Sequence, residues 1–120
     1  MKLRIQGNSI RFRLTQTEVS NFGKQDACMG KVEFPDGNTL IYRLTTATEM
    51  SSYFRNNVIT IALPDTEVES WIKSDIVGVS GDLILENEDK LSILVEKDFK
   101  CLTDRSEDES DMFPNPKESH

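Results

Sequence analysis

Basic side chains alternate with apolar ones in the first half of the chain. Lys2 and Arg4 lie two positions apart in one such segment. Arg11 and Arg13 repeat the spacing, and Arg43 lies in a later segment of the same kind. In a β-strand, residues two positions apart project from the same face. If the intervening apolar residues point to a core, these five cations gather on the polar face of a sheet.

Such a cluster has a chemical use. Arginine suits phosphate and carboxylate groups because its guanidinium presents a planar fork of N–H donors. The five cations are therefore candidate anion-binding residues. The alternative is a solvated sheet face whose charges protect the sheet against edge-to-edge aggregation. The sequence leaves both open.

Carboxylates are the other groups with possible chemistry. Glu33, Glu86 and Glu96 are expected on or near strands, but their spacing fits no metal-binding template, so surface charge is the simpler account. Near the end of the chain, Glu96 and Asp98 have two interpretations. They form an acid pair that faces the basic residues, or they mark the end of a strand whose apolar neighbours close the core.

Nucleophilic and metal chemistry has little support. Cys28 and Cys101 lie 73 positions apart, too sparse for a disulfide framework, so we expect free thiols in a reducing cytoplasm. The only histidine is His120, at the last position, where a positioned imidazole is not expected. We therefore predict no catalytic residue, no metal site and no cofactor.

The elements that position these residues occur twice. Residues 8–26 align without gaps to residues 57–75, and eight of the 19 positions are identical. Self-similarity of this strength indicates an internal duplication. The sequence therefore predicts one structural unit built twice.

Each unit is predicted to be strand-strand-helix-strand-strand. A Gly-Asn pair at 7–8 predicts a hairpin turn. Thr15 and Glu18 form the capping-box pattern, so a helix is expected to begin near Thr15 and to end near Gly23. A Pro-Asp-Gly-Asn turn at 35–38 predicts a second hairpin.

The second half repeats this order. It has an Asn-Asn turn at 56–57, a helix opened by Pro64, and a hairpin that pairs 83–85 with 91–95. The fold class is therefore α+β, with mostly antiparallel strands and two short helices. The architecture is either barrel-like, closed or half-open, or a pair of packed sheets.

The basic residues are not part of what the two halves have in common. The second-half equivalents of the first four cations carry no charge; they are Ser51, Tyr53, Thr60 and Ala62. A residue needed only for the fold is expected to recur in both halves. The basic face, which occurs in one half, is therefore the better functional candidate.

Size and charge exclude several classes of protein. The 120 residues carry a net charge of -7, which argues against generic nucleic-acid binding. No apolar run reaches the roughly 18 residues of a membrane span, and the first residues do not resemble a secretory signal. We expect a cytoplasmic protein without a membrane partner.

The chain is predicted to be a body with a tail. Residues 1–102 form one α+β domain with repeat halves 1–45 and 50–96. Residues 103–120 form an acidic C-terminal tail, which carries 6 acidic and 2 basic residues. This tail is either disordered or docked on the body through Met112 and Phe113. An acidic tail and a basic face also suggest that the tail occupies that face when no ligand is bound.

Three segments carry a resemblance to a known family. These are MKLRIQGNSIRFRLTQTEV at the start, LVEKDFKCL near position 100 and DMFPNP in the tail. The chain resembles a family of short bacterial proteins with no assigned function. The resemblance implies a bacterial, cytoplasmic protein, favours docking of the tail, and provides no activity or catalytic residue to transfer.

Two functions from different classes follow. The first is a non-enzymatic binding or interaction module, whose basic sheet face takes an anionic small molecule or an acidic protein segment. The second is a small metal-dependent enzyme acting on phosphorylated or polyanionic substrates, with Glu33 or Glu96 supplying a metal ligand or a base. A homo-oligomer assembled through sheet edges remains compatible with either function.

Overall fold

The structure repeats one order of elements, strand-strand-helix-strand-strand. The computed structural model describes residues 1–99 and 111–114. The first half contains β1 (Lys2–Gln6), β2 (Ser9–Leu14), α1 (Gln16–Gln25), β3 (Ala27–Glu33) and β4 (Thr39–Ala47). The second contains β5 (Ser51–Arg55), β6 (Val58–Pro64), α2 (Asp65–Lys73), β7 (Gly78–Ile84) and β8 (Lys90–Lys97). The predicted α+β class is confirmed.

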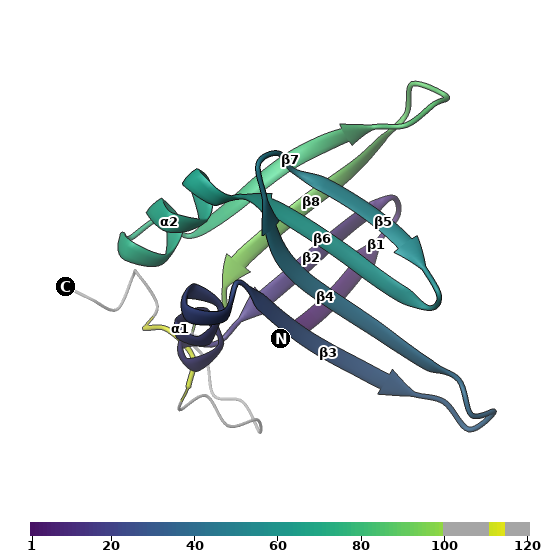
Figure 1. The fold of residues 1–120 in the computed structure, drawn as a ribbon, viewed down its shortest axis with the longest axis horizontal. Helices are drawn as coiled ribbons and strands as arrows, with labels where there is room; N and C mark the ends of the chain where they lie inside the picture. Colours follow the sequence, from purple (N-terminus) through teal and green to yellow (C-terminus); the bar gives the residue numbers. More distant parts are fainter. Residues whose placement is uncertain (100–110, 115–120) are drawn as a thin grey trace.

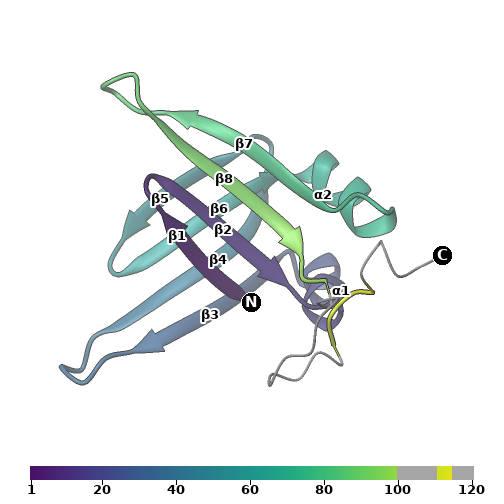
Figure 2. The same cartoon turned by 180° about the vertical axis from the view of Figure 1, so that it is seen from behind.

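The strands form two four-stranded sheets, and each sheet takes one hairpin from each half. The A sheet has the order β1-β2-β8-β7 and the B sheet the order β3-β4-β6-β5. Hairpin partners are antiparallel, whereas the contacts between halves, β2 with β8 and β4 with β6, are parallel. Figure 1 shows the B sheet in front, and Figure 2 shows the A sheet from behind. Of the two predicted architectures, the pair of sheets is correct, and the described strands close no barrel.

Short turns with left-handed residues close two of the hairpins at the predicted positions. Gly7, with φ 56°, lies in the turn between β1 and β2. Asn56 and Asn57 have φ 51° and 64° between the paired residues Arg55 and Val58. Two consecutive left-handed residues match the twist of the flanking strands, which favours a two-residue hairpin.

The first helix begins as predicted but ends later. Glu18 N–H donates to Thr15 Oγ1 at 3.3 Å and Thr15 N–H donates to Glu18 Oε1 at 3.0 Å, which completes the capping box. The helix continues past Gly23 to Gln25 and is capped by Asp26 with φ 57°. The helix therefore ends two residues beyond the predicted position near Gly23.

Gly23 lies where the two helices meet, and Pro64 lies at the start of the second. A Cβ atom at Gly23 would lie 3.3 Å from Ile72 Cδ1, so the glycine lets α1 and α2 approach closely. Pro64 is the last residue of β6, paired with Ala47, and α2 begins one residue later at Asp65. Pro64 is therefore the N-cap of α2, so the helix begins beside it as predicted, with Asp65 as its first residue.

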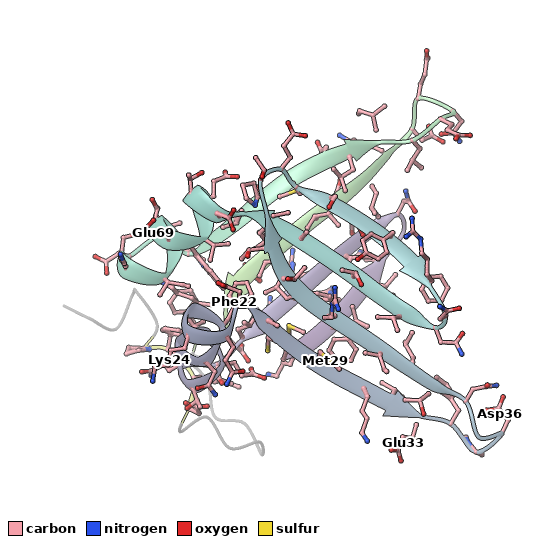
Figure 3. The ribbon with its side chains drawn as sticks, in the orientation of Figure 1. Phe22, Lys24, Met29, Glu33, Asp36 and Glu69 are labelled. Carbon is pink, nitrogen blue, oxygen red and sulfur yellow. The ribbon has the colours of Figure 1, made fainter. Side chains whose placement is uncertain are left out.

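Equivalent residues of the two halves fill the core between the sheets. The matched pairs are Phe12 with Ile61, Leu14 with Leu63, and Phe22 with Trp71, and all six are 0% exposed. The rings of Phe22 and Trp71 contact edge to face with centroids 6.4 Å apart. This contact joins the two helices at one end of the sheets, where Figure 3 labels Phe22. Neither helix of the described residues is both long enough and apolar enough to cross a membrane.

The repeat continues beyond the helices with a shift of two residues. β1 and β5 begin 49 positions apart, whereas β3 and β7 begin 51 positions apart. The offset of 51 pairs Gly30 with Gly81, and each glycine leaves room for a large side chain. A Cβ atom at Gly30 would clash with the ring of Tyr42, and one at Gly81 with Met50 Sδ. The correspondence of the halves therefore includes β3 and β7.

Residues 111–114 lie against α1 and the end of β8. Asp111 O accepts from Gln16 N–H at 3.0 Å, and Asp111 Oδ1 accepts from Thr17 Oγ1 at 2.9 Å. Hydrogen bonds from Thr15 and Thr17 lower the pKa of the Asp111 carboxyl. Asp111 thus accepts from the backbone N–H groups of Gln16 and Thr17, the latter at 3.3 Å, which have no partner inside the helix. The acidic residues 104–109 lie outside the described residues.

Apolar contacts accompany these hydrogen bonds. Met112 is 4% exposed. Phe113 N–H donates to Asp98 O at 2.7 Å, and the Phe113 ring lies 5.9 Å from that of Phe99. Lys97 Nζ lies 5.6 Å from the centre of the Phe113 ring, and burial lowers the pKa of this lysine. The division of the chain into a body and a tail stays a prediction.

A pair of methionine substitutions tests how much the contact of Met112 contributes to stability. We expect Met112→Ala to lower the free energy of unfolding by about 2 kcal/mol, because a buried side chain is removed. Met29→Ala is the matched control, since Met29 is 59% exposed, and we expect its cost to be about 0.5 kcal/mol or less. Urea unfolding measures both. Equal stability of the two variants would show that Met112 is not held against the body in solution.

Candidate anion-binding face

Four of the five predicted cations share the outer face of the A sheet. Lys2 pairs with Arg13 and Arg4 pairs with Arg11 across β1 and β2. Directly paired residues project to the same face, and the intervening Phe12 is buried in the core. The register therefore places two like-charged pairs next to each other on the side of the sheet away from the core.

Arg43 does not join them. It lies on β4 in the B sheet, paired with Met29 on one side and Thr60 on the other. Its Nε atom is buried and has no hydrogen-bond partner among the described residues. The hairpin β3-β4 belongs to the sheet opposite β1-β2, so the five predicted cations divide into a group of four and a single residue.

Two carboxylates, one near the end of β8 and one just after it, compensate part of this charge. Arg13 Nε donates to Glu96 Oε1 at 2.8 Å, and Arg11 Nε lies 3.7 Å from the same oxygen. Lys2 Nζ lies 3.1 Å from Asp98 Oδ2, and the Asp98 side chain is 4% exposed. Glu96 and Asp98 thus lie against the basic face, because β8 runs beside β2.

The compensation is unequal along the face. The Lys2–Arg13 pair has a carboxylate for each cation, whereas the Arg4–Arg11 pair shares only the longer contact from Arg11 to Glu96. Arg4 Nη2 donates to Gln6 Oε1 at 3.3 Å, and within the described residues it has no carboxylate partner. The net positive charge is therefore concentrated at Arg4 and Arg11.

A shallow depression adjoins Arg11 on the same face. Its volume is ≈ 410 Å³, and its residues come from three neighbouring strands. Those that project outward are Ser9 and Arg11 of β2, Ser92 and Leu94 of β8, and Ser80 and Asp82 of β7. The depression therefore has hydroxyl groups, one cation, one carboxylate and an apolar floor.

The equivalent surface of the B sheet is built differently. At an offset of 51 positions, Leu94 is the equivalent of Arg43 and Asp82 is the equivalent of Lys31. Ser80 corresponds in the same way to Met29, which Figure 3 labels on β3. At each of these three positions the residue of the A sheet is shorter than its equivalent in the B sheet, and the two basic residues occur only in the B sheet. The depression and the four cations are both features of the A sheet.

Sequence reasoning missed the residues of β7. The predicted hairpin began at Leu83, whereas the strand begins at Gly78. The signal was present as alternation of Val79, Gly81 and Leu83 with Ser80 and Asp82, but the two glycines weakened it. The outward-facing Ser80 and Asp82 were therefore not considered.

The remaining candidate residues lie apart from this face. Glu33 projects from β3 in the B sheet and pairs with Lys31 at 3.0 Å, with both side chains exposed. Glu86 lies in the loop between β7 and β8. In residues 1–99 and 111–114, no three His, Cys, Asp or Glu side chains are grouped so that they could hold a metal. Cys101 and His120 lie outside the described residues.

The geometry defines a two-sheet α+β protein with a basic face on one sheet. The chain belongs to a family of unknown function, DUF7009, whose model matches residues 1–117. This finding agrees with the resemblance seen in the sequence. No curated protein and no solved structure matches the chain.

Replacing Glu96 tests its compensating role. We expect Glu96→Gln to lower the free energy of unfolding by about 1 kcal/mol at low salt, because Arg11 and Arg13 then lose their shared carboxylate. Glu33→Gln breaks an exposed pair, and we expect it to cost about 0.5 kcal/mol or less. In about 1 M salt the difference should shrink through screening. A Glu96 variant as stable as the Glu33 variant at low salt would contradict this role.

The thiol of Cys28 gives a prediction of pH dependence. Cys28 is a free, half-buried cysteine, and burial, followed by the charge of Glu18, raises the pKa of its thiol. Less thiolate is then present at a given pH, and the thiolate is the reactive form. In a Cys101→Ser background at about pH 8, we expect iodoacetamide to modify Cys28 more slowly than glutathione. A rate equal to that of glutathione would refute the expectation.

Proposed function

We propose that this protein is a non-enzymatic binding module and that Arg4 and Arg11 form the centre of an anion site. The observation that carries the proposal is the direct pairing of these two arginines. Glu96, the one carboxylate near them among the described residues, lies 3.7 Å from Arg11 Nε. The four cations of the face have two carboxylates against them, in a chain whose net charge is -7.

The physical basis is electrostatic. Like charges directly opposite each other on a sheet destabilise it. An anion bound between Arg4 and Arg11 removes this repulsion and forms charge-assisted hydrogen bonds with both guanidinium groups. Because Arg4 is exposed, a ligand can reach the pair from solvent.

The arrangement favours a phosphate over a single carboxylate. A terminal phosphate has three oxygens and can accept from two guanidinium forks at once. The neighbouring depression of ≈ 410 Å³ has the size of a small-molecule site. Of the two kinds of partner, a small anionic molecule is therefore better supported than an acidic protein segment.

The enzymatic alternative has weaker support. It requires Glu33 or Glu96 to hold a metal or to act as a base. These carboxylates lie in different sheets, and each already pairs with a cation, Lys31 at 3.0 Å and Arg13 at 2.8 Å. Neither is arranged as an unengaged base.

Titration with inorganic phosphate and pyrophosphate, followed by calorimetry and thermal shift, tests the proposal. We expect saturable binding, weakened about tenfold or more by Arg4→Gln or Arg11→Gln, because each loses a charge-assisted hydrogen bond. Arg55→Gln is the matched control, since Arg55 lies in the B sheet over the Tyr53 ring. It should bind like the wild type. Absence of saturable binding, or equal loss in all three variants, would overturn the proposal.

Glu96→Gln separates binding from catalysis. Loss of its charge leaves Arg11 and Arg13 more positive, so we expect phosphate and pyrophosphate to bind more tightly than to the wild type. The enzymatic alternative predicts instead a divalent-metal-dependent turnover of pyrophosphate that this substitution abolishes. Measuring affinity and phosphate release on the same samples distinguishes the two.

A further inference from the structure

We infer that the ligand of this face is a phosphorylated sugar or polyol, with its phosphate at Arg4 and Arg11 and its hydroxyl-bearing part in the adjacent depression. The inference rests on the proposed anion site and identifies the class of molecule that it takes. The chemistry of the depression carries the inference. Of the five predicted cations, only Arg11 lines the depression.

The depression continues directly from the arginine pair. Across the sheet, Arg4 is followed by Arg11, then by Leu94, then by Ser80. The next row on this face lies two residues along the strands. It consists of Ser9, paired with Ser92, and Asp82, which pairs with Ser92 on the other side. A ligand anchored at the arginines therefore extends over Leu94 toward the β7 side of the sheet.

The hydrogen-bonding groups of the depression are mainly acceptors. Ser92 Oγ donates to Asp82 Oδ1 at 2.9 Å, and Ser9 Oγ donates to Gln6 O at 2.7 Å. Both hydroxyls have used their proton and retain lone pairs. The hydroxyl of Ser80 has no hydrogen bond within the described residues. Lys90 Nζ lies 3.5 Å from Asp82 Oδ2. A partner that donates several hydrogen bonds, such as a row of hydroxyls, is complementary to this surface.

Size and floor agree with a sugar. β2 and β7 lie on either side of β8, so their backbones are about 10 Å apart. A hexose phosphate is long enough to extend from the arginine side toward Asp82, whereas inorganic phosphate is not. The side chain of Leu94 offers an apolar surface for the C–H face of a sugar ring, while the hydroxyls point to the serines and the carboxylate.

The B sheet shows that this chemistry is not a by-product of the fold. The positions equivalent to Leu94, Ser80 and Asp82 hold an arginine, a methionine and a lysine. These three longer side chains include no hydroxyl and no carboxylate. At these positions the two copies of the backbone unit therefore differ in their hydrogen-bonding chemistry.

The experiment compares two phosphate esters of similar length. Glucose 6-phosphate has a hydroxyl-bearing body, and hexyl phosphate has none. For the wild type we expect glucose 6-phosphate to bind about tenfold more tightly by calorimetry, a difference of about 1.4 kcal/mol. Ser80→Ala should reduce this preference to about threefold or less without changing hexyl phosphate affinity. Asp82→Ala should reduce the preference as well, although loss of a negative charge near Arg11 raises the affinity for both esters. Retained hexyl phosphate binding also shows that the variants are folded.

Controls separate this inference from the proposed anion site. Lys31→Ala, at the position equivalent to Asp82, should leave the preference intact. Arg11→Gln should weaken both esters together. Equal affinity for the two esters, or tighter binding of hexyl phosphate, overturns the sugar inference while the anion site stands. No binding of either ester or of pyrophosphate overturns both.

Discussion

The parallel contact between β2 and β8 is the constraint on which the rest of the structure depends. It joins segments 83 positions apart, from Ser9 with Ser92 to Leu14 with Lys97. The corresponding contact of β4 with β6 does the same in the B sheet. Because the two hairpins of each half lie in different sheets, neither half completes a sheet or covers its apolar faces alone. The two halves therefore form one domain with a shared core, and each half contributes one hairpin to each sheet.

The same contact determines the charge balance of the candidate site. The β1-β2 hairpin by itself has four cations on one face and no carboxylate to balance them. β8 brings Glu96 beside Arg13 and Asp98 beside Lys2, at 2.8 and 3.1 Å. Both acids lie toward the end of the face at Lys2 and Arg13, because the register fixes them there. The uncompensated charge at Arg4 and Arg11 is thus a consequence of where β8 pairs.

Local chemistry was predictable, and long-range pairing was not. The Gly7 turn, the Asn56–Asn57 turn and the capping box of Thr15 each depend on a few neighbouring residues, and the structure contains all three. The pairing of a hairpin from one half with a hairpin from the other leaves no pattern in the local sequence. A hairpin buries the same apolar face whichever hairpin lies beside it in the sheet. Arg43 was therefore grouped with the wrong sheet. The role of Gly23 in helix packing was not predicted for a similar reason, since its packing partner Ile72 is distant in sequence.

The two halves agree where they face the core and differ where they face outward. Equivalent core residues such as Leu14 and Leu63 are fully buried in both halves, because the fold requires each. Outward-facing positions have no such constraint. There the second half has Asp82 where the first half has Lys31. The chemistry of an outer face can thus differ between the two copies of the unit while the shared core stays the same. The polar depression and the arginine pair lie at positions where the two copies differ in this way.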